Sequence, residues 1–554
     1  MTKRSLQIAF VLLLVFALLG LLLLLWWKNL PPRQVFDLMI INGKIVDGTG
    51  KPPFGANIGI KAGKISAVGS LRRAYAPTVI DAKGCIVAPG FIDVHAHVEV
   101  SLPKSGPFRA PNFVRQGVTT IITGNCGRSV EDVGLMFQKL ERYGSQVNVA
   151  TLIGHNTVRR KVMKEATRAP TNSELQRMEN LVRKAMEEGA LGLSTGLEYL
   201  PGMFAPKWEI VALARVAGQY GGLYVTHLRD EGLKVFEAVE EALEIGHEAK
   251  VAVHLSHLKI AAPKLWGNAM QLLALIESQK QGIQVTMDCY PYTSSSTSLT
   301  VLLPKWSLNG GERSLRARLR NETLRRRICE DMIREAMEKG WRSFDFARIA
   351  SCWADPSLNG YSISGLAHFN FNRQHQLPSG LTEMELQAEV ILELLRKGGA
   401  QMIYECMSEH DLTKIMRYKD TMFGSDSSVR YNDMQSKPHP RGYGTFPRVL
   451  ARYVRERKVL SLEEAIRKMT SLPAKTFKLG RRGEIKEGYF ADLVIFDERE
   501  ILDTATYDEP FNPPKGIYFV LVNGQIVYAN GEERPTYSGL PIRHMEPTLH
   551  SLGQ

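Results

Sequence analysis

A chain of 554 residues is long enough for a large barrel with an appended domain, and 44% hydrophobic and 23% charged residues are ordinary for a globular protein. The formal charge of +13 is scattered, and no arginine-rich arm with interleaved aromatic residues is present, which argues against a nucleic-acid partner. Six cysteines without a Cys-x-x-Cys pair exclude a disulfide scaffold.

The N-terminus carries an apolar run from Ile8 to Trp27. Its length matches the roughly 20 residues of a membrane-spanning helix, and basic residues precede it. A cleaved signal peptide is the alternative, but its apolar core is normally about 7–15 residues and ends in small residues. Here two tryptophans and then Pro31-Pro32 follow. We therefore expect residues 1–34 to form a single-pass membrane anchor and linker, with the rest of the chain on the extracytoplasmic side.

Short strand patterns with turn signals occur near both ends of the chain. One alternates around Asn42-Gly43 and another around Asn523-Gly524, and this dipeptide is typical of β-hairpin turns. We expect residues 35–88 and 481–540 to form one small β-sandwich domain together. The strands expected in this domain are Asp37–Asp47, Asn57–Ile65, Val79–Val87, Ala491–Phe496 and Tyr518–Val527.

Between these ends, from Phe91 onward, strand patterns alternate with helical periodicity. Repeated βα units imply parallel strands with right-handed crossovers, and eight such strands predict an α/β fold, a (β/α)₈ TIM barrel, over residues 89–480. An arginine-rich stretch of mixed pattern at about 303–400 is expected to be an insertion covering one face. The expected strands begin at Phe91 and include Val118–Thr123, Asn148–Ile153, Leu191–Leu197, Leu223–Thr226, Val251–Ser256 and Ile283–Met287, and Lys414–Phe423 leads to the last strand end. The expected helices include Ser173–Glu188, Trp208–Tyr220, Val235–Ala249, Met270–Gln281, Phe446–Arg457 and Ser461–Met469.

Residues with metal-binding side chains follow several of these strands. Residues just past the strand ends of a barrel share its active-site face, and His95 and His97, two residues apart, project to the same side. A thiol, imidazoles and a carboxylate suit zinc, and six candidates leave room for two metal positions. Taken singly, each has an ordinary alternative, such as a core histidine, a small buried cysteine or a helix N-cap aspartate. The six candidates are His95, His97, Cys126, His227, His257 and Asp426.

Several motifs at these positions resemble the N-acyl-D-amino-acid deacylases (D-aminoacylases) of the metal-dependent amidohydrolase superfamily. The resemblance runs from about Phe36 to Glu533 and leaves the apolar N-terminal run outside. The motifs are Pro89–His97, Gly124–Gly127 (GNCG), Gly192–Gly202 (GLSTGLEYLPG), Thr226–Glu231 (THLRDE), Ser256–Lys259 (SHLK), Asp288–Tyr292 (DCYPY), Gly424–Asp426 and His439–Leu450 (HPRGYGTFPRVL).

The resemblance implies hydrolysis of the amide bond of a small N-acyl-D-amino acid by metal-activated water, with Asp426 as general acid and base. It implies one tight zinc on Cys126, His227 and His257 and a second, weaker position. That second position would use His95, His97 and Asp426. The segment Leu191–Leu197 has no lysine to bridge two metals, and the Cys126 thiolate looks like its substitute. The implied substrate-binding residues are Tyr199, Lys259, Tyr290, Ser296 and Arg441.

Two other functions fit parts of this pattern. A hydantoinase-like cyclic amidase would share the barrel, but the Gly-Asn-Cys-Gly turn in place of a strand-four lysine argues against it. A catalytically dead, membrane-anchored binding protein would share the overall organisation. The presence of all six metal-ligand candidates argues against that alternative.

Overall fold

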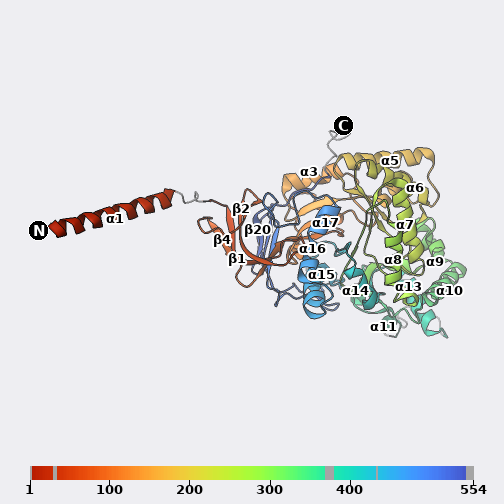
Figure 1. Ribbon diagram of the computed structural model, residues 1–554. Helices are drawn as coiled ribbons and strands as arrows, with labels where there is room; N and C mark the ends of the chain where they lie inside the picture. Colours follow the sequence, from red (N-terminus) through yellow and green to blue (C-terminus); the bar gives the residue numbers. More distant parts are fainter. Residues whose placement is uncertain (1–2, 29–33, 369–379, 432–434, 545–554) are drawn as a thin grey trace.

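The computed structural model describes residues 3–28, 34–368, 380–431 and 435–544. In Figure 1 a single helix, α1 (Lys3–Lys28), lies apart from the rest of the molecule. Its segment Lys3–Leu23 has a mean hydropathy of 2.9, is 0% buried, and is long and apolar enough to cross a membrane; a signal sequence would pass the same test. Pro31-Pro32, which entered the anchor prediction, lies outside the described residues.

A nine-stranded sheet next to α1 is built from both ends of the chain (Figure 1). Its order is β21-β20-β19-β18-β5-β1-β2-β3, with β4 paired to β1. The two chain ends therefore form one sheet domain, and apolar side chains from β1, β2, β4, β18 and β19 share a core. The strands are β1 (Leu38–Ile45), β2 (Phe54–Lys61), β3 (Lys64–Gly69), β4 (Thr78–Asp81), β5 (Ile86–Pro89), β18 (Leu493–Phe496), β19 (Ile517–Val522), β20 (Gln525–Ala529) and β21 (Glu532–Glu533).

The two Asn-Gly pairs have different roles. Asn523-Gly524 joins β19 to β20 with positive φ at both residues, so the expected hairpin turn is confirmed. The hairpin expected at Asn42-Gly43 is wrong, because β1 continues through this pair as a bulge against β2. Because of the bulge, the part of β1 that precedes it pairs with β4, and the part that follows it pairs with β5.

Eight strand positions form the barrel, as expected. The third position is divided into β8 and β9. The barrel closes between its first and last strands, where Asp426 N donates to His95 O at 2.7 Å and His97 N donates to Ser427 O at 2.8 Å. The strands are β6 (Phe91–Asp93), β7 (Val118–Thr123), β8 (Asn148–Thr151) with β9 (Ile153–Gly154), β10 (Gly192–Gly196), β11 (Leu223–His227), β12 (Ala252–Leu255), β13 (Val285–Cys289) and β17 (Thr421–Phe423).

Helices follow most of these strands and pack their apolar faces on the barrel core. Val235–Ala249 is helical as expected, and the helix expected from Ser173 begins one residue earlier. Its cap is Thr171, which forms a reciprocal capping box with Glu174. The helices are α2 (Pro111–Val114), α3 (Val133–Tyr143), α4 (His155–Met163), α5 (Asn172–Glu187), α6 (Lys207–Gln219), α7 (Val235–Ala249), α8 (Ala269–Gln279), α14 (Glu409–Arg417), α15 (Arg441–Arg448), α16 (Leu462–Met469) and α17 (Ser471–Thr476), with the short 3₁₀ helices η1 (Glu99–Ser101), η2 (Gly202–Phe204) and η3 (Pro263–Leu265). A π-helix, η7 (Val449–Glu456), continues α15.

The C-terminal tail completes the barrel beside β8. Ile542 N donates to Val149 O at 2.8 Å, and Val149 N donates to Leu540 O at 3.0 Å. Farther along the tail, His544 N donates to Gly189 O, just before β10. The tail thus supplies backbone partners at the place where β8 lacks a neighbouring strand.

Deleting residues 538–554 is expected to destabilise the barrel. The deletion removes several backbone hydrogen bonds worth about 0.5–1.5 kcal/mol each, so a loss of roughly 3 kcal/mol is expected. Urea unfolding should show a lower midpoint than for full-length protein. Deleting only residues 545–554 is the control, and equal midpoints for the two truncations would contradict the role of the tail.

The insertion has its own core and a three-stranded antiparallel sheet, in the order β14-β16-β15. Two of its strands, β14 and β16, lie just outside the expected 303–400, because the Ser-Thr run of β14 has no alternating apolar pattern. Its elements are β14 (Ser294–Ser298), η4 (Leu299–Leu302), η5 (Lys305–Leu308), α9 (Gly311–Arg320), α10 (Glu322–Glu338), β15 (Ala347–Ser351), η6 (Pro356–Leu358), α11 (Ile363–His368), α13 (Glu383–Arg396) and β16 (Gln401–Glu405).

Candidate metal centre

The six candidate ligands all lie at the carboxyl ends of barrel strands. Three of them, Cys126, His257 and Asp426, have left-handed backbone conformations, with φ of 50°, 34° and 49°. Non-glycine residues rarely adopt this conformation, and such strain gathers at functional sites. His95 and His97 follow β6, and the other four follow or end β7, β11, β12 and β17.

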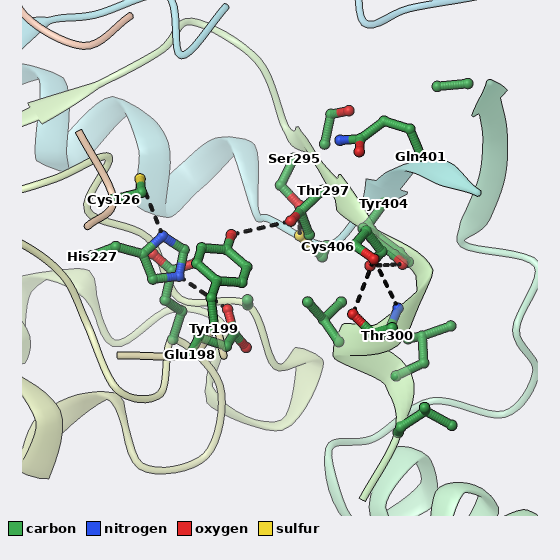
Figure 2. Close-up of a pocket in the computed structure, with 18 of the residues that line it drawn as sticks. Cys126, Glu198, Tyr199, His227, Ser295, Thr297, Thr300, Gln401, Tyr404 and Cys406 are labelled. Carbon is green, nitrogen blue, oxygen red and sulfur yellow. Dashed lines mark hydrogen bonds and ion pairs between the residues drawn. The ribbon is translucent and has the colours of Figure 1, made fainter. Parts of the chain in front are cut away.

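The buried Cys126 thiol lies at the centre of the first group. Its Sγ is 3.3 Å from His95 Nε2, 3.5 Å from His257 Nε2 and 3.7 Å from His227 Nδ1. His227 Nδ1 and His257 Nε2 are 2.9 Å apart. Figure 2 shows the thiol of Cys126 facing the ring of His227 across this space. The structure therefore brings these four side chains together, although they are far apart in sequence.

Asp426 forms a second group beside the first. Its Oδ1 is 3.1 Å from His97 Nε2 and 3.8 Å from His95 Nε2, and its Oδ2 is 2.9 Å from Arg441 Nη1. His95 thus faces both the thiol and the carboxylate. A third group with metal-like spacing joins His227, His257 and Glu231, a residue that was not among the six candidates.

Each of the four imidazoles contacts a carboxylate oxygen through the ring nitrogen that faces away from the other candidate ligands. Such carboxylates fix the tautomer and orientation of metal-binding histidines. The pairs are His95 Nδ1–Asp288 Oδ2 at 3.5 Å, His97 Nδ1–Glu99 Oε1 at 3.6 Å, His227 Nε2–Glu198 Oε2 at 3.0 Å and His257 Nδ1–Glu231 Oε1 at 3.0 Å.

Sequence reasoning did not assign these four carboxylates. Glu231 and Asp288 lie within the motifs THLRDE and DCYPY, so their positions beside candidate ligands were the available signal. His254 Nε2 donates to Asp288 Oδ2 at 2.9 Å and so orients that carboxylate. His155 bonds Glu209 within the core and is separate from the ligand groups.

The charges of this cluster favour a bound cation. Burial alone would raise the pKa of Cys126, but the charge of His95 and hydrogen bonds from His227 and His257 hold that pKa well below its usual value. Without a metal, protons on the imidazoles balance the negative charge of the thiolate. A metal ion binds the thiolate and neutral imidazoles, and it replaces these protons. The mixed sulfur, nitrogen and oxygen donors fit zinc.

The expected substrate-binding residues surround the same space. The Arg441 guanidinium stacks 4.8 Å over the Tyr290 ring and pairs through Nη1 with Asp426, and Tyr290 Oη is buried without a hydrogen-bond partner among the described residues. Lys259 instead donates to Glu231 at 2.6 Å, and Ser296 Oγ donates to Met402 O. Tyr199 Oη accepts from Thr297. A guanidinium beside an unpaired phenol hydroxyl suits an anionic ligand group.

These side chains line one cavity of about 1740 Å³ between the barrel mouth and the insertion. Figure 2 shows how it extends from Cys126 and His227, past Tyr199, toward Tyr404. A sequence model described as the amidohydrolase family matches residues 78–528.

The protein belongs to the amidohydrolase family. A D-aminoacylase from Alcaligenes xylosoxydans xylosoxydans is 34% identical over 518 residues, covering 89% of this amidohydrolase and 95% of the relative. An N-acyl-D-glutamate deacylase from the same organism is also 34% identical, covering 90% and 94%. The similarity to D-aminoacylases inferred from the motifs is thus confirmed.

Solved structures agree with this placement. An N-acyl-D-glutamate deacylase from Bordetella bronchiseptica, in complex with zinc and a phosphonate inhibitor, has a TM-score of 0.76 and 33% identity, covering 92% of this amidohydrolase and 100% of the other chain. An L-hydantoinase from Arthrobacter aurescens, at 18% identity and a TM-score of 0.52, with coverage of 92% and 100%, shares the fold.

Replacing Glu231 by glutamine should weaken metal binding by this amidohydrolase. The substitution removes the negative charge that faces His257 and that pairs with the nearly buried Lys259. Loss of such a supporting carboxylate typically lowers metal affinity about 10–100-fold. Titration of zinc against a competing chelator measures this change. Glu335→Gln, in the same cavity on α10, is the control, and equal affinities for the two variants would contradict the supporting role of Glu231.

Proposed function

We propose that the protein is a zinc-dependent deacylase that hydrolyses the amide bond of N-acyl-D-amino acids and releases a carboxylate and a free D-amino acid. The observation that carries this proposal is the position of the Cys126 thiol, within 3.7 Å of three imidazole nitrogens and beside the group of Asp426. Full-length similarity to proteins named D-aminoacylase and N-acyl-D-glutamate deacylase supports it.

Cys126, His227 and His257 would hold the tight zinc, and His95, His97 and Asp426 a second, weaker position. His95 also faces the thiol, and it links the two sets. A zinc ion bound there would lower the pKa of water to about 7 and polarise the substrate carbonyl.

Asp426 is placed to move the protons of the reaction. The Arg441 guanidinium overcomes the effect of burial and holds the pKa of Asp426 well below its usual value, so the carboxylate is ionised and its oxygens carry no proton. It takes the proton of the attacking water and then gives it to the amide nitrogen. This order matters because an amine leaves poorly unless it is protonated.

Arg441 and Tyr290 would bind the α-carboxylate of the substrate. The buried Tyr290 hydroxyl lacks a hydrogen-bond partner among the described residues, the Arg441 guanidinium lies over the Tyr290 ring, and a guanidinium can hold a carboxylate through two parallel hydrogen bonds. Lys259, Tyr199 and Ser296 are the other groups proposed for substrate binding. Fixing the carboxylate and the reacting carbonyl holds two substituents of the α-carbon, and a third contact, to the side chain, would select one enantiomer.

A panel of N-acetyl-D- and N-acetyl-L-amino acids, combined with metal analysis of the purified protein, tests the proposal. We expect zinc in the protein and amine release from the D series only. Hydrolysis of cyclic amides in place of the linear D series would indicate a hydantoinase-like enzyme. A zinc-bound protein without hydrolysis of either class would indicate a binding protein.

We also propose that α1 anchors the enzyme in a membrane with the barrel on the extracytoplasmic side. The apolar Lys3–Leu23 segment, exposed along its length, supports this proposal. Deleting residues 1–34 should move the protein from the membrane fraction to the soluble fraction without changing kcat/KM for an acetylated substrate. N-terminal sequencing of the mature protein provides the control, because a chain cleaved after the apolar run would identify a signal sequence instead.

A further inference from the structure

The metal-ligand candidates form a row with two different ends. At one end Arg441 contacts Asp426, where the proposed function places the substrate carboxylate. At the other end the Tyr199 ring packs on His227, with 4.7 Å between the ring centroids. A substrate whose carboxylate is held at Arg441 and whose carbonyl lies among the ligands would direct its acyl group toward Tyr199.

Beyond Tyr199 the cavity enters the insertion. Thr297, on β14, donates to Tyr199 Oη at 3.1 Å and so joins the two walls of the cavity (Figure 2). After this point the lining includes a group of half-buried apolar side chains, which pack on the core of the insertion on one side and face the cavity on the other. These residues, called the acyl wall here, are Leu200, Met203, Val301, Leu302, Trp341 and Phe346.

The cavity is larger than an acetylated amino acid requires. Its volume of about 1740 Å³ exceeds the roughly 300–1,000 Å³ of ordinary small-molecule pockets. Trp341 and Phe346 stack with 3.9 Å between their ring centroids and give the acyl wall a flat aromatic surface. Charged residues such as Arg160, Glu165 and Lys234 also line this cavity, so it combines polar groups with an apolar wall.

We infer that the enzyme takes amphiphilic substrates, in which a D-amino acid carries a long aliphatic acyl chain that lies along the acyl wall. This inference rests on the proposed deacylase function and specifies its substrate class. Burying a methylene group contributes about 0.8 kcal/mol, so kcat/KM should rise up to about fourfold per added CH₂ until the wall is filled.

The test measures kcat/KM for one D-amino acid, D-alanine, carrying acyl chains from acetyl to tetradecanoyl, with all concentrations below those at which micelles form. We expect the dodecanoyl substrate to exceed the acetyl substrate by at least about 100-fold. Efficient hydrolysis of acetyl-D-alanine with no gain for longer chains would overturn the inference and leave the proposed function standing. No hydrolysis at any chain length would overturn the proposed function as well.

A charged substitution in the acyl wall provides the second test. In Leu302→Asp the ratio of kcat/KM for dodecanoyl to acetyl substrate should fall at least tenfold. Leu386→Asp is the matched control, because Leu386 is also half-buried against the insertion core but does not line the cavity, and its ratio should remain that of the wild type. Equal ratios in the two variants would overturn the inference. Both substrates are assayed on one preparation, so partial unfolding affects them equally.

Discussion

Asp426→Asn is expected to lower kcat by about 10²–10⁴-fold while the protein keeps its tightly bound zinc. Asparagine has nearly the shape of aspartate, but it cannot accept the proton of water and return it to the leaving amine, and such proton transfer contributes rate factors of this size. The proposed tight site uses Cys126, His227 and His257, so it remains intact. Steady-state turnover of an N-acyl-D-amino acid and elemental analysis of the same preparation measure both quantities.

The matched control for this substitution is Asp230→Asn. Asp230 lines the same cavity, and its Oδ1 accepts hydrogen bonds from the backbone of Gly232 and Lys234, so its carboxylate supports a loop. Its substitution should leave kcat within a few-fold of the wild type. An Asp426→Asn protein that is zinc-replete and fully active would refute the acid-base role.

Cys126→Ala is expected to abolish tight zinc binding and, with it, activity. The thiol is the shared neighbour of three imidazoles, and its removal takes an anionic donor from the space between their nitrogen atoms. Even a supporting residue outside the ligand set changes metal affinity about 10–100-fold, so loss of a ligand should cost at least about 100-fold. Chelator competition and zinc content after dialysis measure the loss.

Cys406→Ala provides the comparison within the same cavity. The Cys406 thiol lies 3.4 Å from Ser295 Oγ, and burial raises its pKa, so it is a protonated side chain away from the imidazoles. This variant should keep its zinc. Equal zinc content in Cys126→Ala and Cys406→Ala would remove the thiol from the ligand set.

Local patterns predicted the barrel because each βα unit repeats the same signal. Local patterns could not distinguish Asn42-Gly43 from Asn523-Gly524. A turn and a bulge differ in the strands that pair with the residues before and after the dipeptide, and these strands can be distant in sequence. The flanks of Asn523-Gly524 pair with each other, whereas both flanks of Asn42-Gly43 pair with β2. Strand β14 was missed for a related reason, since its Ser-Thr run gains order from pairing with β16.

The same limit applies to the site. The candidate ligands were predictable because the strand ends of a barrel converge on one face, so a position in the sequence implies a position in space. Two of the carboxylates behind the imidazoles, Asp288 near the end of β13 and Glu198 just after β10, also stand at strand ends. The imidazole that each carboxylate contacts does not follow from this position. Glu198 contacts His227 from the preceding strand, and Asp288 reaches His95 across 193 positions of sequence, so only the folded chain identifies these pairs.

The hydrogen bonds between β8 and the C-terminal tail have a consequence for biosynthesis. Val149 leaves the ribosome long before Ile542, and at about 5–20 residues per second the interval is on the order of 20–80 s. During that time the nascent barrel has an open strand edge that its own chain cannot yet cover. An exposed edge of this kind pairs readily with other chains, so molecular chaperones should engage the protein until translation ends.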